Sequence, residues 1–258
     1  MRYVILFSAI VMVTGTVEAA VKTEVLEYKH GDVVLQGYIA YDDATDAKRP
    51  GVLVVHQWRG LGDYEKRRAR QLAERGYVAL AADIYGKGVR PKNTQEARAQ
   101  ATKYRSDRQL MRERAQAGLA TLKAHPLCDP ERTAAIGYCF GGGVVLELAR
   151  SGADLKGVVS FHGNLDTPDP SDAKNIKASI AVMHGADDPH VPTEQVLAFQ
   201  KEMRDAGVDW MFTAFGGAVH SFTDSGAGND PSRGSAYNAK ADRRSWEIMK
   251  VFFEEVLK

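Results

Sequence analysis

One cysteine of this sequence lies in a glycine pattern that suits a nucleophile. Residues 137–143 read GYCFGGG, with Cys139 between Gly137 and Gly141, and the helical run 144–150 follows at once. Glycines two places before and after a nucleophile give the clearance that a sharp strand-to-helix turn, the nucleophile elbow, requires. The free N–H groups and dipole of a helix N-terminus favour a thiolate over a thiol. The pattern therefore predicts that Cys139 is a nucleophile.

Three other interpretations of this cysteine stay open: a buried structural residue, a phosphate-binding glycine loop, or a disulfide partner of Cys128. A P-loop needs a Lys-Ser/Thr pair after its glycines, and a dinucleotide-binding loop needs the order G-x-G-x-x-G. Residues 137–143 have neither. We therefore favour the nucleophile over a nucleotide site.

Two adjacent aspartates follow the apolar run 180–183, in residues 184–192 (HGADDPHVP). α/β-Hydrolases carry the acid of their catalytic triad after such a strand. We prefer Asp188, because the Val-Pro pair at 191–192 follows it at the spacing that those enzymes use. Asp187 stays open as the alternative, and a turn-forming aspartate before a helix is the non-catalytic interpretation.

A single histidine follows the last apolar run. Residues 216–222 read GGAVHSF after the run 210–215, which gives the order nucleophile, acid, histidine of α/β-hydrolases. His220 is therefore the predicted general base. Three other histidines are predicted to be ordinary surface or loop residues: His30, His125 and His190.

The first central strand runs into residues 56–60 (HQWRG). In the predicted fold, backbone N–H groups here and just after the nucleophile form the oxyanion hole. We predict the N–H groups of Trp58 and Phe140 as its two donors.

Strands that alternate with helices must position these residues. Residues 23–28 and 33–41 alternate around a Gly-Asp turn and predict an N-terminal antiparallel hairpin. Buried strands are predicted at 51–55, 77–82, 133–136, 157–161, 180–183 and 210–215, and helices at 63–75, 94–124 and 239–257. Pro126 and Pro130 bracket a predicted loop. The pattern predicts an α/β fold with a mostly parallel central sheet, helices on both faces, and chemistry at the carboxyl ends of the strands.

Composition indicates one globular domain. Of 258 residues, 44% are apolar and 26% are charged, and 34 basic against 33 acidic residues give a net charge of +1. No basic stripe indicates a nucleic-acid partner.

The first twenty residues have the layout of a signal peptide. The apolar run 3–13 follows Arg2 and is shorter than the roughly 20 residues that a membrane-spanning helix needs, and Ala19 and Ala20 suit cleavage. We therefore expect a signal peptide at 1–20 and one domain at 21–258, periplasmic or secreted and free of the membrane after cleavage. A retained membrane anchor is the alternative.

Six short stretches together resemble the dienelactone hydrolase family, and the likeness runs from about residue 23 to residue 258. The stretches are 56–61 (HQWRGL), 82–86 (ADIYG), 137–142 (GYCFGG), 160–163 (SFHG), 219–222 (VHSF) and 241–246 (ADRRSW). The resemblance implies a single-domain α/β-hydrolase fold and a Cys-His-Asp triad. It also implies no metal or organic cofactor, and hydrolysis of a lactone through a thioester.

Two departures of the chain from the founding dienelactone hydrolases matter for its chemistry. Those enzymes have a glutamate, which contacts the resting cysteine, where this chain has Gln57. They also hold the substrate carboxylate with arginines, one of which stands where this chain has Asp224. Four residues are candidates for substrate binding: Gln57, Arg59, Lys87 and Arg90.

We therefore expect a hydrolase that cleaves a small-molecule carboxylic ester or lactone through Cys139, Asp188 and His220. Two alternatives belong to other classes. One is a thiol redox or acyl-carrying protein in which Cys128 is the second thiol. The other is a lactone- or ester-binding protein without catalysis, in which Gln57 marks lost activity.

Overall fold

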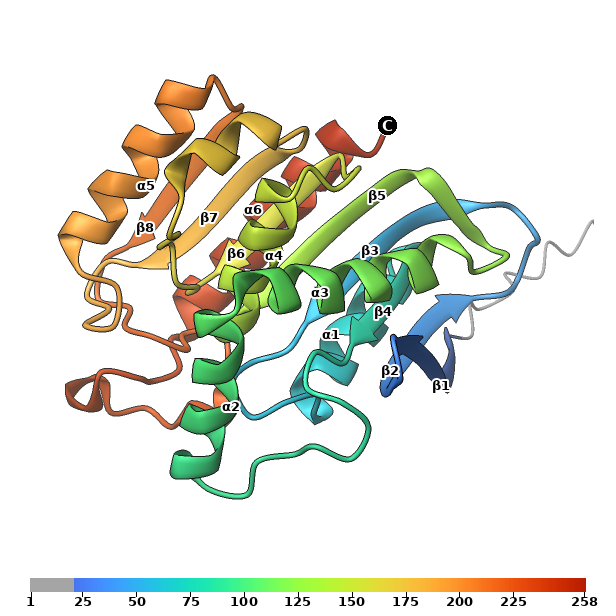
Figure 1. Ribbon diagram of the computed structural model, residues 1–258, viewed down its shortest axis with the longest axis horizontal. Coiled ribbons are helices and arrows are strands. Elements are labelled where there is room, and N and C mark those ends of the chain that lie inside the picture. Colours follow the sequence, from blue (N-terminus) through green and yellow to red (C-terminus); the bar gives the residue numbers. More distant parts are fainter. Residues whose placement is uncertain (1–20) are drawn as a thin grey trace, which may run out of the picture.

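The computed structural model in Figure 1 describes residues 21–258. The predicted signal peptide at 1–20 lies outside the described residues. The described strands form one eight-stranded sheet in the order β1-β2-β4-β3-β5-β6-β7-β8. They are β1 (Val21–His30), β2 (Val33–Asp42), β3 (Arg49–Val55), β4 (Val78–Ala82), β5 (Cys128–Tyr138), β6 (Gly157–Phe161), β7 (Ser179–Gly185) and β8 (Trp210–Phe215).

The predicted hairpin and the mostly parallel sheet are both present. β1 pairs with β2 in antiparallel register around the turn at Gly31 and Asp32, and β2 pairs antiparallel with β4. From β4 through β8, all neighbours pair in parallel. The carboxyl ends of six parallel strands therefore meet at one edge of the sheet, where ligands bind in folds of this kind.

Six α-helices and three short 3₁₀ turns cover the described sheet and its loops. The helices are α1 (Asp63–Ala73), α2 (Thr94–Ser106), α3 (Arg108–Lys123), α4 (Phe140–Arg150), α5 (Thr193–Ala206) and α6 (Ala239–Val256). The turns are η1 (Pro170–Asn175), η2 (Ser225–Ala227) and η3 (Pro231–Arg233). The region 94–124, predicted to be helical, contains α2 and α3, and Asp107 caps the second of these through a bond from the Leu110 N–H.

The two faces of the sheet are buried under different helices. Alternate side chains of a strand point to opposite faces, so Leu53 and Val55 of β3 join one core cluster while Val52 and Val54 join another. The first cluster contains side chains of α3, α4 and α5, and the second contains side chains of α1 and α6. Figure 1 shows this three-layer arrangement, with α3, α4 and α5 in front of the strands and α1 and α6 behind. Both faces of the central strands are therefore dry, as their continuous apolar runs require.

β5 begins five residues earlier than predicted. The sequence indicates a loop up to Pro130 and a strand from Thr133, whereas the strand runs from Cys128. Arg49 and Pro50 pair with Cys128 and Asp129, and the register then shifts so that Gly51 pairs with Thr133. Proline lacks an N–H and is tolerated at such an irregularity, so Pro130 does not end the strand.

Candidate active site

Cys139, His220 and Asp188 form an unbroken chain of hydrogen bonds at the carboxyl edge of the sheet. The Nε2 atom of His220 lies 3.0 Å from Sγ of Cys139, and its Nδ1 atom lies 2.8 Å from Oδ2 of Asp188. Cys139 follows β5, Asp188 follows β7 and His220 follows β8. They are 6%, 6% and 9% exposed, respectively. The structure thus brings together the three residues that the sequence singled out as nucleophile, base and acid.

The two adjacent aspartates face different partners. Asp188 accepts from His220 and also from the His190 N–H at 2.8 Å. Asp187 is exposed and accepts from the Gly217 N–H at 3.0 Å, which ties two turns together. Of the two, Asp188 is the one in contact with the histidine.

The backbone around Cys139 has the geometry of a nucleophile elbow. Cys139 adopts φ 55° and ψ −116° and is the residue that precedes helix α4. A Cβ atom on Gly137 would lie 1.9 Å from the Gly141 carbonyl oxygen, and one on Gly141 would lie 2.3 Å from the Val55 carbonyl oxygen. Real Cβ atoms do not come that close, so both flanking positions require glycine.

The charges at the site favour a thiolate beside an imidazolium. Burial opposes ionisation of Cys139, but the nearby charge and hydrogen bond of His220, the Phe140 N–H and the charge of Arg105 together lower the pKa of Cys139 below its usual value. Burial likewise opposes the cationic form of His220, but Cys139 and Asp188 outweigh it and raise the pKa of His220. Each partner stabilises the charged form of the other.

The two predicted oxyanion donors belong to Trp58 and Phe140, and the Phe140 N–H interacts with the Cys139 thiolate. In the described part of the chain, the N–H groups of Trp58 and Phe140 donate to no carbonyl or carboxylate oxygen. Two hydrogen bonds to the backbone of Gln57 fix the turn that carries Trp58. Buried Glu65 accepts the Gln57 N–H at 3.1 Å, and His56 Nδ1 lies 2.6 Å from the Gln57 carbonyl oxygen. Because His56 Nε2 accepts the Ile84 N–H at 3.2 Å, the Nδ1 atom carries the proton of this neutral ring.

A cavity of about 350 Å³ opens beside Cys139. Its lining contains two cations that the sequence analysis did not single out, Arg98 and Arg105, both on α2. Arg105 is half-buried and donates to the side-chain oxygen of Asn164. The complete lining is Trp58, Arg98, Ala101, Arg105, Cys139, Asn164, His190, His220, Ser221 and Ser235. Positions 98, 101 and 105 share one helix face, and this spacing is a signal by which the two arginines could have been found.

The four candidates for substrate binding lie outside this lining. Gln57 donates through Nε2 to Asp224 at 2.8 Å, and the Arg59 guanidinium stacks over the Trp58 ring at 5.5 Å. Lys87 forms an ion pair with Glu27. Arg90 donates to the Val89 carbonyl oxygen at 2.8 Å and lies 3.5 Å from Asp83. Gln57, Lys87 and Arg90 are therefore engaged by other polar groups of the protein, whereas Arg59 is exposed beside Trp58, which itself lines the cavity.

Cys128 lies at the far end of the strand that presents Cys139. It opens β5 opposite Arg49, whereas Gly137, two residues before Cys139, lies opposite Val55. The six residue steps of β3 from Arg49 to Val55, at roughly 3.3 Å each, put the two cysteines at least about 20 Å apart. A disulfide needs Cα atoms within about 7 Å. Both cysteines are free, and Cys128 is buried. The geometry therefore contradicts the alternative in which Cys128 resolves a disulfide with Cys139.

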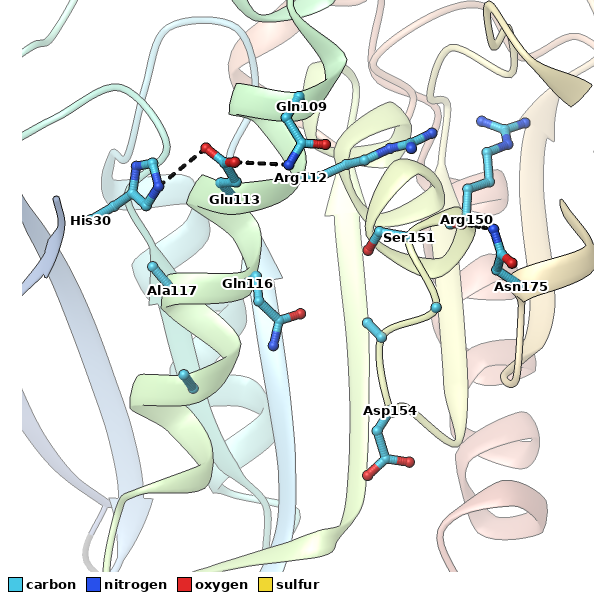
Figure 2. Close-up of a pocket in the computed structure, with 13 residues that line it drawn as sticks. His30, Gln109, Arg112, Glu113, Gln116, Ala117, Arg150, Ser151, Asp154 and Asn175 are labelled. Carbon is cyan, nitrogen blue, oxygen red and sulfur yellow. Dashed lines mark hydrogen bonds and ion pairs between the residues drawn. The ribbon is translucent and has the colours of Figure 1, made fainter. Parts of the chain in front are cut away.

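A larger groove of about 820 Å³ lies apart from this site, between α3 and the end of α4 (Figure 2). Its charged residues face protein partners: Glu113 lies 3.2 Å from His30 and accepts from Gln109, and Arg112 pairs with Asp172. Within residues 21–258, no group of three or more His, Cys, Asp or Glu side chains is placed to hold a metal ion. In the same residues, no helix combines the length and apolar character needed to cross a membrane.

Comparison with known proteins places the chain in a family. The sequence model of the dienelactone hydrolase family matches residues 35–257. A solved structure titled as a dienelactone hydrolase-like promiscuous phosphotriesterase from metagenomic libraries is 42% identical, covers 93% of this chain and 100% of its own, and superposes with a TM-score of 0.89. An uncharacterized protein of Caenorhabditis elegans is 40% identical over 56% of this chain and 93% of its own length. A Synechocystis protein provisionally named carboxymethylenebutenolidase is 24% identical over 92% of this chain and 98% of its own length. The chain therefore belongs to the dienelactone hydrolase family and is a hydrolase with the α/β fold of that family.

Proposed function

We propose that this protein hydrolyses a carboxylic ester or lactone with Cys139 as nucleophile, His220 as acid and base, and Asp188 as the group that orients His220. The observation that carries the proposal is the continuous Asp188–His220–Cys139 contact, 2.8 Å and 3.0 Å long, at the wall of the 350 Å³ cavity. Family membership supports ester or lactone hydrolysis as the reaction class.

In the first half of the reaction, the Cys139 thiolate attacks the substrate carbonyl carbon. The carbonyl oxygen becomes an oxyanion, which the N–H groups of Trp58 and Phe140 stabilise. The tetrahedral intermediate collapses, the bond to the leaving oxygen breaks, and His220 gives its Nε2 proton to that oxygen. An alcohol leaves, or in a lactone the ring opens, and Cys139 holds the acyl group as a thioester.

In the second half, His220 is neutral and takes a proton from water. The resulting hydroxide attacks the thioester carbonyl, the C–S bond breaks, and the thiolate is restored next to protonated His220. The carboxylic acid is released. Throughout, the Asp188 carboxylate holds the Nδ1–H of His220 and stabilises its cationic form.

The substrate we propose carries a negative charge at a distance from its reacting carbonyl. Arg98 and Arg105 line the cavity with Cys139, and a planar guanidinium suits recognition of a carboxylate. Lys87 and Arg90 lie outside the lining, so on this proposal α2 supplies the anion-binding groups.

A second candidate activity is the hydrolysis of phosphotriesters. The relative titled as a promiscuous phosphotriesterase is 42% identical over nearly the whole chain. A thiolate beside backbone N–H donors can attack phosphorus as well as carbon: the S–P bond forms, the bond to the leaving alkoxide or aryl oxide breaks, and the phosphoryl oxygen takes the place of the carbonyl oxygen.

The test is turnover of a p-nitrophenyl ester, a lactone and a p-nitrophenyl phosphotriester by the wild-type protein and by Cys139→Ala. We expect the variant to lose turnover of every substrate that the wild type cleaves. Cys128→Ala is the matched control and should keep wild-type rates. Unchanged turnover in Cys139→Ala would refute the proposed nucleophile, and ligand binding without turnover by the wild type would favour the binding-protein alternative.

We also propose that residues 1–20 are a cleaved signal peptide that directs the chain to the periplasm or outside the cell. The short apolar run behind Arg2 supports this. Mass spectrometry of the protein from a periplasmic or culture fraction should give an N-terminus at residue 20 or 21, and an intact Met1 would contradict it.

A further inference from the structure

Three residues other than glycine have a left-handed backbone in residues 21–258, and all three meet at this site. They are Cys139 (φ 55°), His162 (φ 39°) and Ser221 (φ 58°). Such strain persists only where the surroundings fix the residue, and it clusters where function requires it. The elbow accounts for Cys139, and Ser221 follows His220. His162, from the stretch 160–163, has no part in the reaction described above.

The ring of His162 bridges the nucleophile and the loop that carries His220. The Cys139 N–H donates to its Nδ1 atom at 3.1 Å and also to the Phe161 carbonyl oxygen at 3.0 Å, and its Nε2 atom lies 2.8 Å from Oγ1 of Thr223. A backbone N–H can only donate, so Nδ1 is unprotonated and Nε2 carries the hydrogen that it gives to Thr223. The side chain is fully buried, and burial holds the pKa of His162 well below its usual value. The ring is therefore neutral and its two bonds have fixed directions.

Thr223, three residues after His220, is in turn fixed to the helices behind the sheet. Its Oγ1 atom lies 2.6 Å from the Tyr64 hydroxyl, and its carbonyl oxygen accepts from Arg68 at 3.1 Å. Arg68 forms a nearly buried ion pair with Asp242 of α6. The stretch 241–246, like the stretch 160–163, thus acts on the loop after β8.

Close packing holds the His162 segment against the start of α4. A Cβ atom on Gly163 would lie 2.7 Å from Cα of Gly142, and one on Gly142 would lie 2.6 Å from Oγ of Ser160. The His162 ring also packs edge-on against the His220 ring, with centroids 5.4 Å apart. His162 therefore contacts the nucleophile's backbone, the base and the base's loop at once.

We propose that His162 is a positioning residue that sets the distance between Cys139 and His220 by linking the nucleophile elbow to Thr223. The inference rests on the proposed function, in which that pair does the chemistry. His162 does not line the cavity, and both of its nitrogens are engaged. It therefore acts through Cys139 and His220. If the bond between His162 and Thr223 is lost, His220 can move away from Cys139. The attraction between the imidazolium and the thiolate, which keeps Cys139 ionised, falls with distance.

The experiment compares Thr223→Val, which has nearly the same shape but no hydroxyl, with Thr223→Ser, which keeps it. Two quantities are measured: the rate at which iodoacetamide alkylates Cys139 as a function of pH, and kcat and KM for the ester. The titratable or charged side chains around Cys139 and His220 include Asp188, His184, His190, Arg105, Tyr85 and His162, and neither substitution changes them.

We expect Thr223→Val to move the midpoint of the alkylation profile upward, toward the value of about 8.5 of an ordinary thiol. We also expect kcat to fall about 10- to 100-fold with KM within about two-fold, as a misplaced catalytic pair predicts. Thr223→Ser should match the wild type. In His162→Asn the side-chain oxygen can accept the Cys139 N–H but does not reach Thr223. This variant should behave like Thr223→Val, and the same measurements on it test the inference if Thr223→Val does not fold.

A merely structural role gives a different result. The substituted proteins would then melt at a lower temperature but keep the wild-type kcat and alkylation profile when folded, and that result would overturn the inference. Failure of the proposed function is distinguishable, because alkylation needs no turnover. A shifted profile in a chain that cleaves no ester would support the positioning role of His162 and refute the hydrolysis.

Discussion

The side-chain amide of Gln57 donates to the carboxylate of Asp224 across 2.8 Å, although the two residues are 167 positions apart in the sequence. At both of these positions the chain departs from the founding dienelactone hydrolases. The departures therefore form one contact. The Gln57 side chain is thereby engaged with Asp224, while the side-chain hydrogen-bond partner of Cys139 is His220.

Replacing one member of this contact should destabilise the protein, and replacing both should not. Gln57→Glu sets a carboxylate against that of Asp224 in a half-buried site, and we expect a loss of about 1 kcal/mol in the free energy of unfolding. Adding Asp224→Asn restores the hydrogen bond in the reverse direction, because the new side-chain amide at position 224 can donate to the new carboxylate at position 57. Urea denaturation of the wild type, both single variants and the double variant forms a double-mutant cycle. Additive effects would contradict the coupling.

Alkylation with iodoacetamide should label Cys139 at pH values where ordinary thiols react slowly. The pKa of Cys139 is lowered, so the thiolate is present above that lowered value and is lost as the pH falls through it. The pKa of His220 is raised, so the imidazolium persists above the usual range of histidine and is lost only at alkaline pH. The value of kcat/KM should therefore rise with pH as Cys139 ionises, reach a plateau, and fall at alkaline pH as His220 loses its proton.

Cys128 provides the control in the same molecule. Burial, with a smaller contribution from Asp129, raises the pKa of Cys128 to about 11. Peptide mass spectrometry after brief labelling near neutral pH should find Cys139 modified and Cys128 unmodified. Equal labelling of the two cysteines would show that Cys139 is not ionised.

The neighbouring aspartates offer a matched pair of substitutions. Asp188→Asn removes the charge that stabilises protonated His220, and we expect kcat to fall on the order of 10²- to 10⁴-fold. Asp187→Asn weakens only the bond from the Gly217 N–H and should leave kcat within about two-fold while lowering stability by about 1 kcal/mol. Steady-state kinetics on both variants decides the assignment. A larger loss in the Asp187 variant would reverse it.

Arg98 and Arg105 should discriminate between charged and neutral substrates. For Arg105→Gln we expect KM for an ester with a distal carboxylate to rise about 10-fold, and KM for a neutral ester of the same size to change less than about two-fold. Arg98→Gln should show the same trend more weakly, because Arg98 is exposed. Lys87→Gln is the control, since Lys87 pairs with Glu27 outside the cavity. Equal changes for both esters would argue against an anionic substrate.

Much of this architecture follows from the sequence because parallel strands deliver their carboxyl ends to one edge. Cys139, Asp188 and His220 each follow an apolar run, and that local fact suffices to predict that they meet. Asp188 could be preferred to Asp187 only through spacing, since both sit in the same polar turn. The direction in which each side chain points depends on the loop after β8, which provides Gly217 to one aspartate and His220 to the other.

The substrate side of the site could not be predicted in the same way. Which face of α2 looks into the cavity depends on how Ala97, Ala101 and Tyr104 pack, so the placement of Arg98 and Arg105 is a tertiary property. The contact between Gln57 and Asp224 joins loops after different strands and has no local signal. The early start of β5 depends on an irregularity opposite Pro50, which no propensity scale records.

The separation of the two cysteines along β5 also governs how the protein withstands oxidants. A thiolate reacts readily with peroxides to give a sulfenic acid, which is normally rescued when a second thiol condenses with it. Cys128 lies a full strand length away from Cys139, so within residues 21–258 no internal thiol can perform that rescue. Recovery of peroxide-treated enzyme therefore depends on a thiol supplied from outside, and prolonged exposure converts Cys139 irreversibly to its higher oxides.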